Sequence, residues 1–165
     1  MKRTVGIAAL VVFTLLAGQA WAQVIATRVR TSDIIVPVGV CPGVGCPFLP
    51  LNNNAGSTSM VFVTTVDNQR VVISYNAECT VAAASTATWV SLSIFVDGVL
   101  AAPSSTDKAH CTSNNNGSNW VSAVATGVIV VPDPGLHTVQ VRAQILNGVA
   151  GNTARIDDGS LIIMK

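Results

Sequence analysis

Residues 120–165 decide the fold, and they read WVSAVATGVIVVPDPGLHTVQVRAQILNGVAGNTARIDDGSLIIMK. The segment holds a β-rich run at 120–131, a turn at Asp133-Pro134-Gly135, a second run at 137–146 and a third at 155–164. In the second run, apolar and polar residues alternate with the period of two that places one set of side chains on each face of a strand. We therefore expect a central hairpin followed by a closing strand.

The two strands of this hairpin should differ in character. The run 120–131 would extend about 40 Å, so we expect a bend, at Gly127. Its two faces both carry apolar residues, which is typical of a central strand. In the run 137–146, one apolar face should point into the core: Val139, Val141, Ala143 and Ile145.

Further strand candidates precede this block. They cover 23–30, 34–38, 60–66, 70–81, 89–96 and 99–102. The run 70–81 has a clear period of two, with one apolar face: Val71, Ile73, Tyr75, Ala77, Cys79 and Val81. Asp97-Gly98 is a typical two-residue hairpin turn, and the polar segment 104–119 should be a loop. No helical periodicity follows residue 22. The sequence thus predicts an all-β, antiparallel two-sheet sandwich, jelly-roll-like, with about eight strands.

Residues 1–22 have the pattern of a cleaved signal peptide. Lys2 and Arg3 are followed by an apolar stretch and by the small-x-small site Ala20-Trp21-Ala22, so the mature chain should begin at Gln23. The apolar run is about 13 residues, whereas a membrane span needs roughly 20. We expect a secreted, periplasmic or cell-surface protein with no membrane span. Residues 23–56 would form a first strand and a Pro/Gly/Cys loop, in one domain with the sandwich body at 57–165.

The composition excludes some partners. Charged residues make up 10% of the chain, against about 25% in ordinary domains. Loss of Lys2 and Arg3 would change the formal net charge from +1 to about −1. Such a chain lacks the basic surface that nucleic acid or anionic membranes require. An uncharged surface also lacks the repulsion that keeps copies apart.

Four cysteines in an exported chain favour two disulfides. Three pairings are possible, and we favour Cys41–Cys46, within a Pro/Gly-rich loop, and Cys79–Cys111, between a strand and a distant loop. The chain-entropy model gives about 2 kcal/mol for the short loop and roughly 3.5 to 4 kcal/mol for the long one. A metal site is disfavoured, because paired Cys-x-x-Cys spacing is absent and the compartment is oxidising.

Two C-terminal segments carry a family resemblance. Pro-Asp-Pro-Gly-Leu-His-Thr-Val-Gln-Val-Arg-Ala at 132–143 and Ala-Arg-Ile-Asp-Asp-Gly-Ser-Leu-Ile-Ile-Met at 154–164 resemble the end of bacterial secreted jelly-roll domains of the C1q/TNF-like class. There, a Gly-x-His-Thr-Val strand precedes a closing strand that ends in Ser-Leu and aliphatic residues. The resemblance covers roughly residues 71–165. It implies trimerisation and ligand binding at loop tips.

No catalytic set is apparent in the sequence. His110 lies in the polar segment and should be exposed, whereas His137 should pack or hydrogen-bond at a strand end. No Gly-x-Ser-x-Gly nucleophile motif occurs. Asp157-Asp158-Gly159-Ser160 offers oxygen ligands for calcium, but aspartates at turns usually bond to the backbone. We predict no catalytic residue, no metal ligand and no cofactor.

These observations predict an exported, non-enzymatic structural or interaction protein. It would assemble as a trimer or other homo-oligomer, or bind an extracellular protein or glycan. The alternative is a carbohydrate-binding module that uses Trp89 or Trp120, because both tryptophans fall near strand starts, at the ends of the sandwich.

Overall fold

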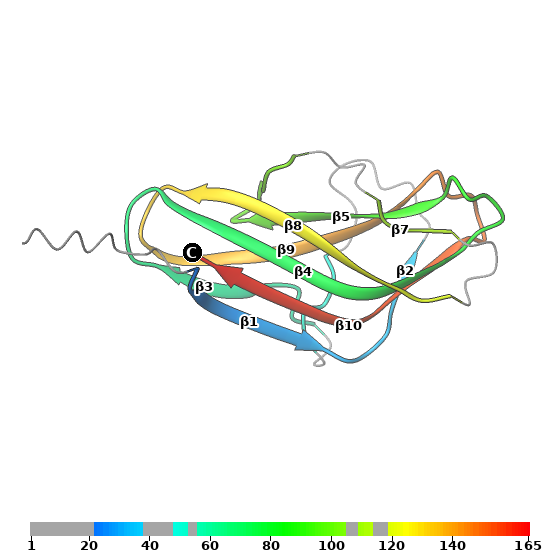
Figure 1. The fold of residues 1–165 in the computed structure, drawn as a ribbon, viewed down its shortest axis with the longest axis horizontal. Helices are drawn as coiled ribbons and strands as arrows, with labels where there is room; N and C mark the ends of the chain where they lie inside the picture. Colours follow the sequence, from blue (N-terminus) through cyan, green and yellow to red (C-terminus); the bar gives the residue numbers. More distant parts are fainter. Residues whose placement is uncertain (1–21, 38–47, 53–55, 105–108, 114–118) are drawn as a thin grey trace, which may run out of the picture.

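The computed structural model describes residues 22–37, 48–52, 56–104, 109–113 and 119–165. They form ten β-strands in two antiparallel five-stranded sheets (Figure 1). Sheet A has the order β1 (Val24–Arg30), β10 (Thr153–Met164), β4 (Gln69–Ala82) and β8 (Val121–Val131), and β2 (Ile34–Pro37) also pairs with β10. Sheet B has the order β3 (Met60–Thr64), β9 (Gly135–Leu146), β5 (Trp89–Val96) and β6 (Val99–Leu100), and β7 (Ala109–Thr112) also pairs with β5. Within these ranges no helix is long and apolar enough to cross a membrane.

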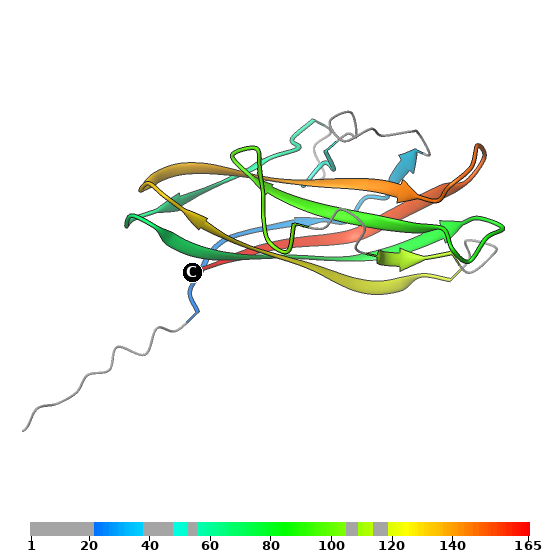
Figure 2. The same cartoon turned by 90° about the horizontal axis from the view of Figure 1, so that it is seen from above.

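The strand pairs are nested along the chain. The β5–β6 hairpin is innermost, and the pairs β4–β8, β3–β9 and β1–β10 enclose it in turn. The pairs β10–β4 and β9–β5 then join these ribbons within each sheet. One long antiparallel ribbon wrapped into two facing sheets is a jelly roll, and Figure 2 shows the two layers. The predicted fold class is confirmed.

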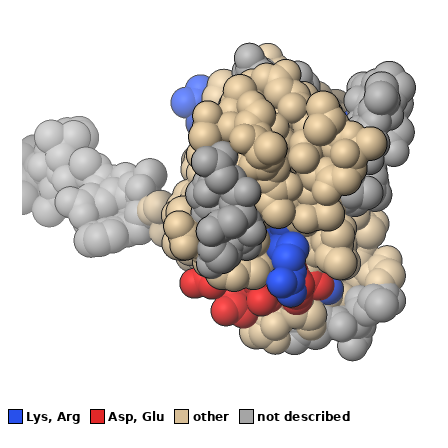
Figure 3. Space-filling model, turned by 90° about the vertical axis from the view of Figure 1, so that its right-hand side faces the viewer, with Lys and Arg blue, Asp and Glu red and all other residues tan. Residues whose placement is uncertain are grey.

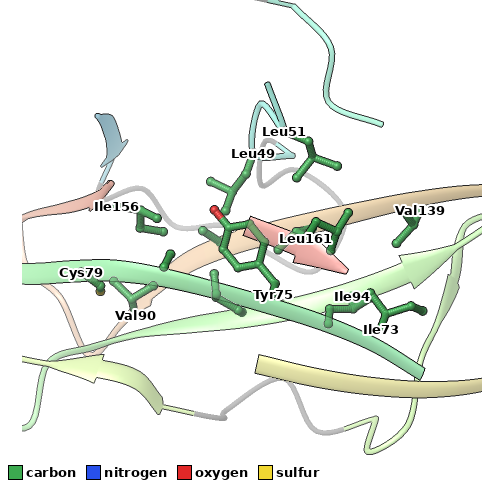
Figure 4. Close-up of a cluster of buried hydrophobic side chains, with 14 of the residues drawn as sticks. Leu49, Leu51, Ile73, Tyr75, Cys79, Val90, Ile94, Val139, Ile156 and Leu161 are labelled. Carbon is green, nitrogen blue, oxygen red and sulfur yellow. The ribbon is translucent and has the colours of Figure 1, made fainter. Parts of the chain in front are cut away.

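The core lies between the two sheets and follows the predicted alternation. Every residue of the predicted apolar faces of β4 and β9 is buried. Tyr75 of β4 and Leu161 of β10 point into this layer together with residues of sheet B such as Val139 (Figure 4). Burial of a large aliphatic or aromatic side chain stabilises by about 1.5–3 kcal/mol. The period of two was therefore sufficient to identify most of the core.

The expected hairpin at residues 132–135 is wrong. β8 belongs to sheet A and β9 to sheet B, so the chain crosses between the sheets at this turn. Pro132 and Pro134 have no backbone N–H and cannot donate to a hairpin ladder. The strand β10, expected to close a sheet, instead lies between β1 and β4.

The expectation of a central strand at 120–131 is also wrong, because β8 is an edge strand. Within the described residues, β8 pairs along its length only with β4. The apolar residues on its second face remain accessible, notably Val124 and Val130. Gly127 lies where the sheets approach closely, since a Cβ there would stand 2.9 Å from the Cβ of Ala101.

Two further differences concern short strands. The segment 104–119, expected to be a loop, contains β7, which pairs with the first residues of β5. In β1 the pairing register shifts between Val24 and Ala26, and Val29 is 62% exposed. Gln23 exchanges two backbone hydrogen bonds with Lys165 (2.9 and 3.0 Å), so the predicted first mature residue joins the C-terminal end of sheet A.

Candidate interaction surface

The outer face of sheet A carries three rows of side chains, each crossing four strands. Cross-strand partners define them as Val24, Met164, Val72 and Val128; Thr27, Ile162, Ser74 and Thr126; and Val29, Ser160, Asn76 and Val124. None of these twelve side chains is charged. Because valine, threonine and serine are compact and uncharged, this face can approach another surface without desolvating an ion.

Charged residues of sheet A surround these rows: Arg70 of β4 lies beyond the first row, opposite Val130, Arg28 and Arg30 lie on the edge strand β1, and others lie beyond the third row. Glu78 and Asp157 are cross-strand partners there, and Arg155 forms an ion pair with Asp33 nearby. Figure 3 views the end of the sandwich where β5 and β8 begin, and acidic and basic atoms lie next to each other on it. The uncharged face is therefore bounded at one end by mixed charge.

On the outer edge of β8, the described residues form backbone hydrogen bonds at Val128 and at no other position. Val128 exchanges two backbone hydrogen bonds with Ala102 (2.7 and 2.8 Å), so the N–H and C=O of Val128 point away from β4. The β4–β8 register has no shift, and alternate residues of a strand direct these groups to the same side. The backbone groups of Ser122, Val124 and Thr126 therefore point outward too.

The other edges of the described sheets are shielded. β1 carries a bulge as well as Arg28 and Arg30. β3, β6 and β7 have five, two and four residues, and β2 ends in Pro37. Bulges, charges, proline and short length are the usual means by which proteins prevent pairing at edges. The eleven residues of β8 include no charge and no proline.

The two predicted ligand-binding tryptophans do not form one platform. Trp89 begins β5 in sheet B and is half-buried, and its Nε1 is buried without a hydrogen-bond partner. Trp120 directly precedes β8 of sheet A and is 37% exposed. The guanidinium of Arg155 lies 5.5 Å from the Trp120 ring centroid. Of these two tryptophans, Trp120 has the more accessible ring.

The disulfide Cys79–Cys111 is confirmed. It joins β4 of sheet A to β7 of sheet B, and both cysteines are buried. The predicted Cys41–Cys46 bridge lies outside the described residues. The confirmed bridge crosses the core, so it holds the two sheets together at the end where β8 begins.

His137 lies at a strand end, as predicted, and is part of a buried hydrogen-bond network. Its Nδ1 is 2.7 Å from Asp97 Oδ2, and its Nε2 is 3.0 Å from both Thr64 Oγ1 and the Asp133 carbonyl oxygen. This order resembles a nucleophile–base–acid relay. Thr64, however, is only 2% exposed, and its hydroxyl donates to the Asp133 carbonyl, so it is buried and already hydrogen-bonded. The network joins β3, β9 and the β5–β6 turn.

Asp97 receives several hydrogen bonds in this network. The Thr138 amide (2.7 Å) and hydroxyl (3.0 Å) donate to its Oδ1. Partial burial acts to raise the pKa of Asp97, but the bonds from Thr138 and His137 outweigh it and lower that pKa. The carboxylate is thus held ionised, and its hydrogen bonds connect the β5–β6 turn to β9.

His110 is buried, so the prediction that it would be exposed is wrong. It is 8% exposed, and neither ring nitrogen has a hydrogen-bond partner. Burial lowers its pKa to about 4. A cavity of about 80 Å³ adjoins the ring, between β7 and β8. The imidazole is therefore neutral at physiological pH.

The described part of the chain contains no cluster of three or more His, Cys, Asp or Glu side chains that could hold a metal. Asp157 and Asp158 belong to the segment that offered oxygen ligands for calcium. There the Asp158 amide donates to Asp157 Oδ1 (2.9 Å), and Asp158 has a φ of 46°. That carboxylate contacts the backbone of a β-bulge in β10.

Neither a family model nor a curated protein matches this chain. Among solved structures, it is similar to the VP2 subviral particle of infectious bursal disease virus (14% identity, TM-score 0.41), covering 87% of this chain and 33% of that one. It is also similar to the CBM22-1 xylan-binding domain of Paenibacillus barcinonensis Xyn10C (10% identity, TM-score 0.34, 87% and 96% covered). A third similarity is to CBM35 from Cellvibrio japonicus Abf62 (15% identity, TM-score 0.31, 79% and 92% covered). The chain spans about a third of the VP2 chain, and the similarities concern the β-sandwich fold alone.

Proposed function

We propose that this chain is an exported, non-enzymatic domain that acts by self-association through the surface of sheet A. The observation that carries the proposal is the uncharged outer face of that sheet, continued by the edge of β8, to which Ala102 is the one described residue that bonds. Export is supported by the signal-peptide pattern of residues 1–22 and by the Cys79–Cys111 disulfide. The buried Thr64 hydroxyl supports the absence of hydrolytic chemistry at His137.

Light scattering coupled to size-exclusion chromatography tests the proposal on residues 23–165. We expect a mass above that of one chain, rising with concentration. The association should persist in about 1 M salt, because screening at a Debye length of about 3 Å weakens contacts between exposed charges and not uncharged ones. A strict monomer at every concentration would overturn self-association. The measured mass also distinguishes a dimer from the trimer that the C1q/TNF-like resemblance implies.

A second candidate function, carbohydrate binding, is favoured by the accessible ring of Trp120. Aromatic rings that remain exposed can stack on apolar faces of ligands. A glycan array with the wild type, Trp120→Ala and Trp89→Ala tests it. We expect loss of binding with Trp120→Ala, whereas binding that survives both changes would exclude this function for either residue.

A further inference from the structure

The edge of β8 has the chemistry of a site for another strand. Ser122, Val124 and Thr126 each direct an N–H and a C=O away from β4, and no described residue bonds to these groups. Their side chains are exposed, with Val124 at 60%. A row of alternating donors and acceptors at the spacing of a strand is satisfied best by a second extended backbone.

The sequence of this edge indicates which strand fits. Residues 122–126 read Ser-Ala-Val-Ala-Thr, a near-palindrome centred on Val124. In an antiparallel pair of strands, the numbers of two facing residues add up to the same value all along the pair. A two-fold axis at Val124 would therefore place Val124 opposite itself and Ser122 opposite Thr126 of the second copy. The alanines at 123 and 125 would also face each other.

We propose that two copies of this chain pair edge to edge through β8, antiparallel, about a two-fold axis at Val124. This inference rests on the proposed self-association and specifies its partner and geometry. Each of the three facing pairs exchanges both backbone hydrogen bonds, about six in all. The Ser–Thr pairs add hydroxyl contacts of the kind that stabilise cross-strand neighbours, and the alanines bring no bulk to the interface.

Charge also favours a second copy over a different partner. Residues 111–132 contain no Asp, Glu, Lys or Arg, so a two-fold axis brings no like charges together along β8. The paired β8 strands would merge the two A sheets into one continuous sheet. The uncharged outer faces described above would then lie side by side, without a break.

Charged substitutions at Val124, on the proposed two-fold axis, test the pairing geometry. Light scattering measures the association of each variant. Val124→Lys places two lysines opposite each other and Val124→Glu two glutamates, so each variant alone should associate about tenfold more weakly or worse. An equimolar mixture should recover a dimer with one copy of each. Val61→Lys, at a similarly exposed valine on sheet B, should associate like the wild type. Circular dichroism and the unfolding midpoint verify that the exposed substitutions leave the fold intact.

Cross-linking gives a second readout that does not rely on affinity. Val124→Cys should form an intermolecular disulfide on oxidation, because facing residues of a hydrogen-bonded pair lie about 5.5 Å apart at Cα. Val29→Cys, equally exposed on β1, should not. The wild type could associate while the Val124 substitutions have no effect and Val124→Cys forms no cross-link. That result would overturn the β8 geometry alone. A wild type that is monomeric at every concentration would overturn the proposed self-association as well.

Discussion

The hydroxyl oxygen of Tyr75 lies 2.6 Å from the point where a Cβ on residue 159 would stand. Residue 159 is glycine, in the bulge of β10 between Asp157 and Ser160. The bulge and the missing side chain together leave room for the buried tyrosine ring. A local irregularity in one strand thus accommodates the largest side chain among the fully buried ones of sheet A.

Gly159→Ala should lower the free energy of unfolding by about 1–3 kcal/mol, because overpacking displaces the ring or the strand. Urea denaturation measures the change. Tyr75→Phe removes the clashing oxygen, so Gly159→Ala should cost less in the Tyr75→Phe background than in the wild type. Equal costs in both backgrounds would show that the two residues are not coupled.

Asp97→Ala should destabilise by about 1–3 kcal/mol, because it leaves His137 Nδ1 and the Thr138 amide without their acceptor. Thermal and urea unfolding measure the loss. Asp67→Ala is the matched control, since Asp67 is an exposed aspartate next to another turn. It should change stability by no more than about 0.5 kcal/mol. Similar effects of the two changes would mean that the network does not fasten the β5–β6 turn.

The double change Cys79→Ala, Cys111→Ala should cost roughly 3.5 to 4 kcal/mol, because the bridge restricts the unfolded chain across a sequence separation of 32 residues. Chemical denaturation of the variant and of the oxidised wild type gives this difference. Peptide mapping without reductant should find the two cysteines linked. A free thiol at either position in the native protein would contradict the pairing.

Faces within a strand could be predicted from the sequence, whereas the position of a strand in a sheet could not. The alternation along β4 and β9 identified buried residues such as Val71 and Val141, because the period of two acts within one strand. Membership of a sheet depends on pairing with distant segments. β8 has apolar residues on both faces, which is typical of a covered central strand, yet its second face lies open at an edge.

The missed burial of His110 has a related cause. Its neighbours in the sequence are polar, so local composition indicated an exposed loop. The predicted Cys79–Cys111 bridge contained the contrary information, because it required the residue after His110 to reach the buried face of β4. Long-range constraints of this kind outweigh local polarity.

Stability should fall on acidification because of His110. Burial lowers its pKa from 6.5 to about 4, so between these values the unfolded chain binds a proton that the folded chain does not. The loss should approach about 3 kcal/mol as the pH falls from 6.5 to about 4. The facing groups offer no compensating charge: Tyr75, whose ring centroid lies 6.5 Å away, has a pKa raised by burial to about 12. The residues that line the adjoining cavity are likewise uncharged: Leu92, Ala109, Val124, Ala125 and Thr126.

Urea denaturation of the wild type and of His110→Phe across this pH range measures that loss. Phenylalanine keeps an aromatic ring in the apolar site and cannot take up a proton, so the variant should lose most of the pH dependence between pH 6.5 and about 4. Contributions from the carboxylates are common to both proteins and cancel in the comparison. An equal loss of stability in the two proteins would show that protonation of His110 is not its cause.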